Sequence, residues 1–117
     1  MEPLIDPMPE EVDAMARHLL DQASRRGLKL ATAESCTGGL VGAILTDVER
    51  TSHAFERDFI VYSDEAKAEI LDVHQMLIDA EGAVSKAVAL AMAKGALAHG
   101  RYHSGGDWLC RACGTGR

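Results

Sequence analysis

Aromatic residues are scarce in this chain of 117 residues, which holds one Trp, two Tyr and two Phe. Because aromatics make up only 4% of the sequence while 47% is hydrophobic, a core must be built mainly from Ala, Val, Leu, Ile and Met. Cysteine is also scarce, and the three cysteines are scattered and odd in number. This usage argues against a disulfide scaffold and favours a reducing compartment.

Basic residues are few relative to acidic ones, with 12 Lys and Arg against 18 Asp and Glu and a formal charge of −6. Nucleic-acid binding usually needs a basic patch or stripe, so we expect no nucleic-acid partner. A local pocket could still bind a small anionic substrate. No run approaches the roughly 18 apolar residues of a membrane span, and the acidic residues 1–6 do not resemble a signal peptide. We therefore expect one cytoplasmic domain without a membrane partner.

Helical periodicity begins after a tail at residues 1–8. Pro9 suits the first turn of a helix that ends before Gly27, and its predicted buried face is Val12, Met15, Ala16, Leu19 and Ala23. Residues 28–33 are predicted as a strand and residues 37–48 as a helix.

The second half of the pattern begins with a predicted strand over residues 55–62, whose apolar run suggests cover on both faces. Ser63 is a good N-cap for a helix ending near Leu71. Residues 74–81 are predicted as a further short helix that ends at Gly82. Ser85 is the predicted cap of an Ala-rich helix over 86–99, which can lie close against a sheet or another helix. Alternating helices and strands indicate an α/β layered fold.

Residues 100–117 show no strand pattern beyond 108–110, so the sheet is expected to lack a third strand. We divide the chain into a tail (1–8), a partial α/β domain (9–99) and an atypical tail (100–117).

The most informative segment is residues 33–39, Ala-Glu-Ser-Cys-Thr-Gly-Gly, between a predicted strand and a predicted helix. Ser35 there lies at the positive end of a helix dipole, and the following Thr and Gly residues expose backbone N–H groups. The segment could supply a nucleophile, an anion cradle or a helix cap.

Two further segments, 62–67 (Tyr-Ser-Asp-Glu-Ala-Lys) and 82–85 (Gly-Ala-Val-Ser), occur in the same order as in a known family. With residues 33–39 they resemble the CinA C-terminal domain family over about residues 10–99. The resemblance implies a three-layer α/β/α domain with a mixed sheet. It also implies hydrolysis of nicotinamide mononucleotide to nicotinate mononucleotide and ammonia, an activity of characterised family members.

By the same resemblance, Ser35 is the nucleophile and Tyr62 and Lys67 are its activating partners, while the backbone at Thr37, Gly38 and Gly39 binds the substrate or the oxyanion. An amide is a poor electrophile, so a serine needs a base. None of the five histidines lies in a family motif, and a lysine can replace histidine where burial favours its neutral form. Tyr62 could relay a proton or hold the Lys67 amine. No metal or cofactor is required, and the partners expected are a nucleotide substrate and a second copy of the chain in a homo-oligomer.

Simpler interpretations exist for each residue. Ser35 and Thr37 could only cap a helix, Lys67 could be a solvated lysine, and Tyr62 could place its ring in the core. Cys36 fits a small buried hydrophobe better than a second nucleophile. Glu34 could orient Lys67 or make structural hydrogen bonds.

Two alternative functions follow from other features. The whole chain could be a non-catalytic nucleotide-binding or regulatory module. Zinc could bind the tail, whose compatible ligand types are His99, His103, Cys110 and Cys113, although the two pairs are too close for the usual finger loop.

The tail itself has a further interpretation. Family members continue with a strand of the type A-D-I-A-V-A-x-T-G, followed by an A-G-P turn. If the first base of the Gly100 codon is dropped, permitted codons read A-D-I-I-A-V-A-T-G-F-A-G-P. We therefore interpret residues 100–117 as a frameshift product. A genuine tail would lack the family's active-site threonine, and the amidase would be impaired.

Overall fold

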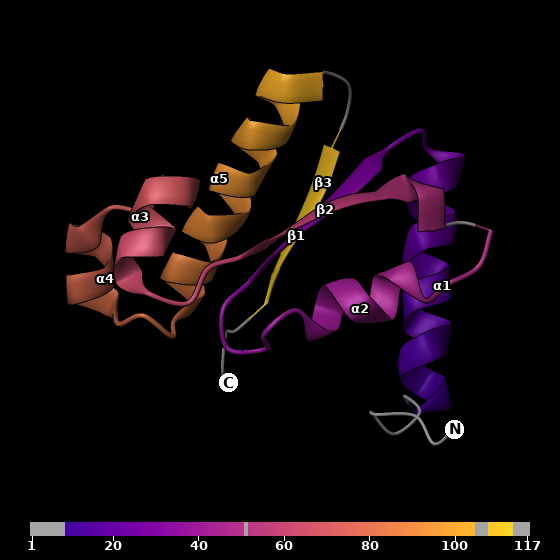
Figure 1. Cartoon of the computed structure of the whole chain (residues 1–117), viewed down its shortest axis with the longest axis horizontal. Helices are drawn as coiled ribbons and strands as arrows, with labels where there is room; N and C mark the ends of the chain where they lie inside the picture. Colours follow the sequence, from indigo (N-terminus) through magenta and orange to yellow (C-terminus); the bar gives the residue numbers. More distant parts are fainter. Residues whose placement is uncertain (1–8, 51, 105–107, 114–117) are drawn as a thin grey trace.

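The chain folds into three layers, with a sheet between two groups of helices (Figure 1). This computed structural model describes the backbone of residues 9–50, 52–104 and 108–113 and the side chains within 9–50 and 53–100. The sheet holds β1 (Lys29–Glu34), β2 (Phe55–Ile60) and β3 (Trp108–Cys113). The helices are α1 (Glu10–Arg25), α2 (Leu40–Thr46), α3 (Asp64–Leu71), α4 (Gln75–Glu81) and α5 (Lys86–Ser104), with a short 3₁₀ turn, η1 (Ser52–Ala54). The predicted α/β class is confirmed.

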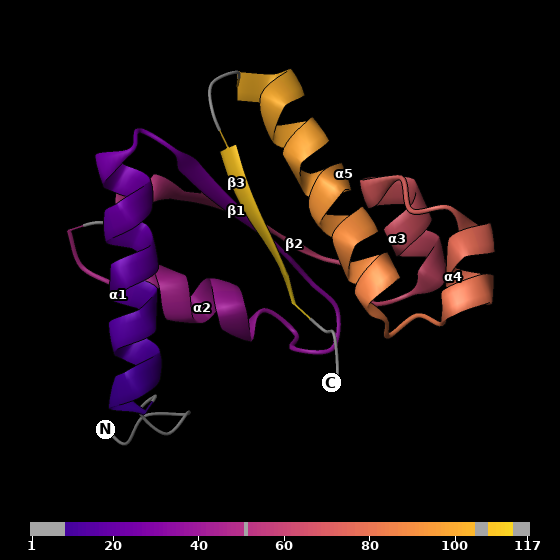
Figure 2. The ribbon, with the colours of Figure 1, turned by 180° about the vertical axis from the view of Figure 1, so that it is seen from behind.

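The two groups of helices lie on opposite sides of the sheet. Helices α1 and α2 cover one face, and α3, α4 and α5 lie beyond the other (Figures 1 and 2). Strand order is β2-β1-β3, and both pairings are parallel. The resemblance implied a mixed sheet, but no antiparallel strand occurs among the three that the structure describes.

The expectation of a missing third strand is wrong. Strand β3 pairs with β1 in register from Lys29 opposite Trp108 to Glu34 opposite Cys113. Parallel strands need a long crossover connection, and the helices α3 to α5 supply it between β2 and β3. Strand β1 is therefore central, which explains why every residue from Leu30 to Glu34 is buried.

Helix α1 begins and ends as predicted. Glu10, Glu11 and Asp13 lie in its first turn, and Gly27 follows it with a φ of +66°, a left-handed conformation that glycine tolerates. The predicted buried face is confirmed at Ala16 and Ala23 but not at Met15, which is 69% exposed. Val12 and Leu19 are half-buried, and the unpredicted Leu20 is fully buried. The stripe that faces the sheet follows Ala16, Leu20 and Ala23.

Alternating residues of β1 divide the interior into two apolar clusters. Leu30 packs with α1 and α2 residues, and Ala33 packs with residues of the α3–α5 layer. Helix α5 approaches α3 closely at Gly95, where an added Cβ would lie 2.1 Å from the Leu71 carbonyl oxygen. The prediction that this Ala-rich helix packs closely is confirmed.

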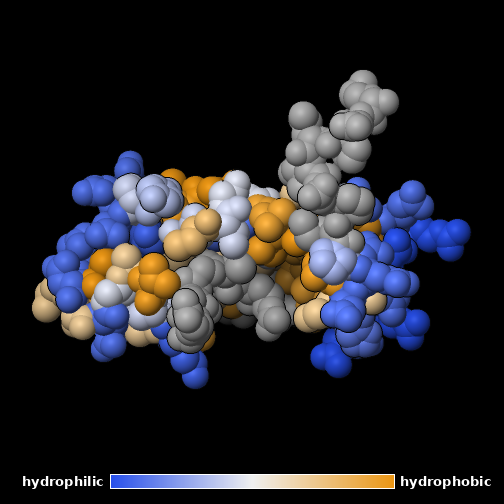
Figure 3. Space-filling view, turned by 90° about the horizontal axis from the view of Figure 1, so that it is seen from below, coloured by the Kyte–Doolittle hydropathy of each residue, from blue (hydrophilic) through white to orange (hydrophobic). Residues whose placement is uncertain are grey.

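Strand β2 is an edge strand, so the prediction that it is covered on both faces is wrong. Its exposure is clearest at Ile60, which is 54% exposed, and the strand ends there rather than at Tyr62. Seen from below, hydrophilic residues cover the two ends of the molecule and hydrophobic residues gather between them (Figure 3).

Candidate active site

The Ser35 turn leaves the sheet at the carboxyl end of β1. In open parallel sheets, ligands bind outside the carboxyl ends of the strands. The neighbouring strand leaves at the same edge, because the Val61 N–H donates to the Glu34 carbonyl at 2.9 Å. Ser35 and Tyr62 therefore begin two neighbouring loops at the carboxyl ends of β1 and β2.

Two glycines give the turn its shape. Gly38 and Gly39 have φ angles of +62° and +101°, in the left-handed region that residues with a Cβ rarely adopt. An added Cβ on Gly39 would also lie 3.0 Å from Ile60 Cδ1. The predicted helix start at Thr37 is therefore wrong, and α2 begins at Leu40 after an N-cap at Gly39.

Glu34 caps α2 from outside the helix. Its Oε1 accepts hydrogen bonds from the Thr37 hydroxyl at 2.6 Å and the Val41 N–H at 3.0 Å, and its Oε2 accepts from the Gly42 N–H at 3.0 Å. The interpretation of Ser35 or Thr37 as the cap is wrong, because neither accepts these amides. Two N-terminal amides of α2 already have an anionic partner, so the oxyanion site assigned to this helix end reduces to the turn at Thr37–Gly39.

A second carboxyl group lies against Glu34. Asp58 of β2 accepts a hydrogen bond from the Thr32 hydroxyl at 2.8 Å and shares another with Glu34. Burial raises the pKa of Asp58 to about 7, and the adjacent Glu34 adds to that rise. Burial also acts to raise the pKa of Glu34, but its hydrogen bonds with Asp58, Thr37, Val41 and Gly42 outweigh it and lower that pKa to about 2.

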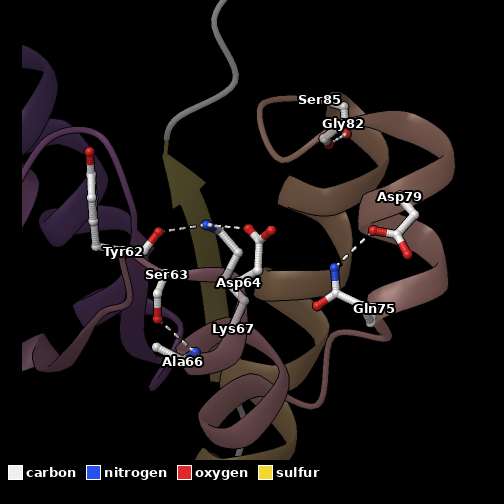
Figure 4. A network of polar contacts seen from close by, with 9 residues as sticks. All are labelled: Tyr62, Ser63, Asp64, Ala66, Lys67, Gln75, Asp79, Gly82 and Ser85. Carbon is white, nitrogen blue, oxygen red and sulfur yellow. Dashed lines mark hydrogen bonds and ion pairs between the residues drawn. The ribbon is translucent and has the colours of Figure 1, made fainter.

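Lys67 is buried, so the interpretation of it as a solvated lysine is wrong. Its side chain is 3% exposed, and its Nζ donates to the Tyr62 carbonyl at 2.9 Å (Figure 4). The Asp64 carboxylate lies 3.8 Å from the same nitrogen. Ser63 fixes the start of α3 by accepting the Ala66 N–H at 3.0 Å, as its predicted N-cap role requires.

Tyr62 meets Lys67 through its backbone. Its residue is 80% exposed, so the interpretation that its ring lies in the core is wrong. Figure 4 shows the phenol pointing away from the Lys67 amine. The tyrosine holds the amine with its carbonyl oxygen, and a proton relay through its hydroxyl has no hydrogen bond to support it within the described residues.

Ser35 is half-buried, and its hydroxyl makes no hydrogen bond within the part of the chain that the structure describes. Lys67 is thus placed beside Tyr62 but not in hydrogen-bond contact with Ser35. Cys36 is exposed, which corrects its interpretation as a buried hydrophobe. Glu34 does not contact Lys67; its bonds are the structural ones.

The proposed zinc ligands lie mostly outside the described side chains, which include His99 but not His103, Cys110 or Cys113. Among described residues, no group of three or more His, Cys, Asp or Glu could hold a metal ion. Nor does any helix within those residues have the length and apolarity to cross a membrane.

Sequence reasoning missed Asp58 and Thr32. The signal that could have revealed Asp58 was its charge inside the predicted apolar strand 55–62. Its partner was not evident, since Thr32 is 26 positions away and only the register of β1 and β2 places Asp58 opposite it.

Fold and site together define an α/β protein with a polar site beyond the carboxyl ends of two adjacent parallel strands. The sequence matches the CinA C-terminal domain over residues 12–105, and the chain belongs to this family. A crystal structure of the competence/damage inducible protein CihA from Agrobacterium tumefaciens superposes with a TM-score of 0.75 and 37% identity, covering 81% of this chain and 58% of that one.

Two curated relatives extend the comparison. A CinA-like protein of Colwellia psychrerythraea is 44% identical over 94 residues, which are 80% of this chain and 22% of the relative. The nicotinamide-nucleotide amidohydrolase PncC of Escherichia coli is 49% identical over 72 residues, which are 62% of this chain and 44% of the relative. The chain therefore spans less than half the length of both curated relatives.

Proposed function

We propose that this chain carries the nucleophile half of an amidohydrolase site that converts nicotinamide mononucleotide to nicotinate mononucleotide and ammonia. The observation that carries the proposal is the buried Lys67 amine, held at the same sheet edge as the Ser35 turn. Among the described residues, the Lys67 nitrogen has one short hydrogen bond, to the Tyr62 carbonyl, although a lysine ammonium can donate three. The name of the Escherichia coli relative supports the substrate class.

The proposed chemistry begins with attack of the Ser35 oxygen on the carboxamide carbon, while the Lys67 amine takes the hydroxyl proton. The C–N bond then breaks, and Lys67 returns the proton to the leaving nitrogen, which departs as ammonia. Water next attacks the ester on Ser35 and yields the carboxylate and a free serine. Backbone N–H groups at Thr37, Gly38 and Gly39 would stabilise the oxyanion.

Apolar groups beside the turn suit the pyridine ring of this substrate. Leu40, Ile60 and Tyr62 are 38%, 54% and 80% exposed, and all three lie on the segments that frame the Ser35 turn. An aromatic ring gains free energy by covering such surface, so these side chains would help to hold the base while the turn faces the amide.

The direct test is ammonia release from nicotinamide mononucleotide by the purified chain and by Ser35→Ala. We expect Ser35→Ala to lose at least about a thousandfold in kcat/KM. Cys36→Ala is the matched control, since it removes the neighbouring exposed thiol and should leave the rate unchanged. Full activity of Ser35→Ala, or loss confined to Cys36→Ala, would reject Ser35 as the nucleophile.

A nucleotide-binding module without turnover is the second candidate function. It is favoured by one observation, the lack of a hydrogen bond to the Ser35 hydroxyl within the described residues. Calorimetry would detect binding of the mononucleotide to the wild-type chain, and an ammonia assay on the same sample would detect turnover. Binding without ammonia would support this module and reject the amidase.

A further inference from the structure

Two carboxyl groups from adjacent strands meet beneath the first turn of α2. Glu34 is fully buried at the end of β1, and Asp58 reaches it from β2. Helix α2 lies directly on the pair, because an added Cβ on Gly42 would be 2.5 Å from Asp58 Oδ2. Gly42 therefore permits the helix backbone to approach both acids.

The donors around the two acids are unequal. Glu34 accepts from the Thr37 hydroxyl and from two backbone amides, whereas Asp58 accepts from the Thr32 hydroxyl at Oδ1. Two carboxylates in contact cannot both ionise without strong repulsion. A proton held by the pair would therefore reside on Asp58, and Oδ2, the oxygen near Gly42, would carry it toward Glu34.

We propose that Glu34 and Asp58 share one proton and act together as positioning residues, fixing the Ser35–Gly39 turn against α2 and releasing it when that proton is lost. The inference deepens the proposed function, because the fixed turn is the one that carries the assigned nucleophile. Its primary readout is structural, so its failure and the failure of the amidase proposal are distinguishable.

Loss of the shared proton falls in the neutral range, because the pKa of Asp58 is raised from an ordinary 3.8 to about 7. For an acid whose pKa is raised in the folded state, the stabilisation is fully present below the unfolded pKa and is lost as pH rises through the folded one. The turn should thus be held tightly in mild acid and loosen as pH passes about 7.

Among the residues whose side chains are described, few other charges face the pair. Helix α2 has no titratable residue, and no charge of α1 is among the main causes of either pKa shift. On β2, Glu56 is bonded to Arg57 and lies within electrostatic reach of Lys29 of β1. Arg111 of β3 is opposite Thr32 in register, and its side chain is outside the described set, so the experiment includes Arg111→Gln.

Hydrogen exchange at the Val41 and Gly42 amides tests the proposal without any substrate. After correction for intrinsic exchange, wild-type protection of these two amides should fall about tenfold or more between about pH 5.5 and pH 8.5. Asp58→Asn should abolish this fall, because its amide donates to Glu34 and cannot ionise. Glu56→Gln, which removes a carboxylate of the same strand, should behave as wild type, and so should Arg111→Gln.

Direct titration of the wild-type chain covers the case in which a variant fails to fold. The carboxyl carbon of Asp58, followed by NMR, and the amide shifts of Val41 and Gly42 should change with one midpoint near pH 7. Protection that stays constant with pH, an Asp58 midpoint near its ordinary value, or the same loss in Asp58→Asn would overturn the proposal. If Arg111→Gln alone removed the pH dependence, Arg111 rather than the shared proton would be responsible.

Discussion

Two charged side chains, Glu34 and Lys67, are buried at one edge of the sheet in very different surroundings. Glu34 is 0% exposed and accepts from three donors besides its bond with Asp58. Lys67 is 2% exposed and has one short bond, to the Tyr62 carbonyl, with Asp64 at 3.8 Å. A buried charge whose hydrogen bonds are all made is held in place by them, whereas Lys67 has fewer partners among the described residues. The contrast supports a structural role for Glu34 and agrees with the reactive role that we propose for Lys67.

The largest expected effect is on activity, from Lys67→Met. Loss of the base should lower ammonia release by at least about a thousandfold. The unfolding free energy should change by less than about 1.5 kcal/mol, because an apolar side chain of similar size can replace a buried ion at little cost. Lys86→Met is the matched control, since Lys86 is exposed at the start of α5. A stable, fully active Lys67→Met would show that Lys67 is not the base and would remove its contrast with Glu34.

Glu34→Ala should show the opposite pattern, with stability as the main loss. Removing the carboxylate leaves the Thr37 hydroxyl and the Val41 and Gly42 amides without their acceptor. We expect the unfolding free energy to fall by about 3 kcal/mol, measured by urea denaturation at about pH 6. Glu56→Ala removes an exposed carboxylate and should cost under about 0.5 kcal/mol. If Glu34→Ala cost no more than this control, its structural role would be rejected.

Gly95→Ala tests whether the close contact between α5 and α3, the helix that carries Lys67, contributes to stability and activity. An added Cβ would meet the Leu71 carbonyl oxygen at 2.1 Å, so α5 must move away from the end of α3. Overpacking of this kind should lower the unfolding free energy by about 2 kcal/mol and also weaken activity, because Lys67 lies on α3. Lys94→Ala, at the exposed neighbouring position, should change thermal unfolding little. Unaltered stability of Gly95→Ala would argue against the close helix contact.

Ser63→Ala should have the smallest effect. It removes the bond that Ser63 Oγ accepts from the Ala66 N–H at 3.0 Å, and N-cap losses cost about 1 kcal/mol. The Tyr62 carbonyl and the Lys67 amine are unchanged, so ammonia release at low temperature should persist. Ser63→Thr retains the acceptor and should recover most of the stability. A loss of activity without a loss of stability would assign Ser63 to the reaction instead.

Local signals in the sequence located most helices. Ser63 predicts the start of α3 because its hydroxyl accepts an N-terminal amide, and Gly27 and Gly82 mark ends because they adopt positive φ. The family was evident from three ordered segments, and its match over residues 12–105 confirms it. The catalytic roles of Ser35, Tyr62 and Lys67, the domain boundaries and the frameshift interpretation stay predictions.

Local signals failed where distant segments decide the outcome. Strand β3 was not predicted because its sequence is weakly strand-like, yet β1 offers it a free edge for parallel pairing. The start of α2 was misplaced because Glu34, outside the helix, supplies the cap that Thr37 was expected to supply. The exposure of Tyr62 follows from the end of an edge strand, which periodicity within one segment does not reveal.

By itself the sequence determined the α/β class, the family, most of the helix ends and the Ser35 turn, since these depend on short-range propensity, capping and ordered motifs. Only the tertiary structure decided that the Glu34 carboxylate accepts hydrogen bonds from Thr37, Val41 and Gly42, that Asp58 lies against it, and that Lys67 is buried against a carbonyl. Those properties depend on strand register and helix packing, because burial and electrostatic surroundings arise only when segments far apart in the chain come together.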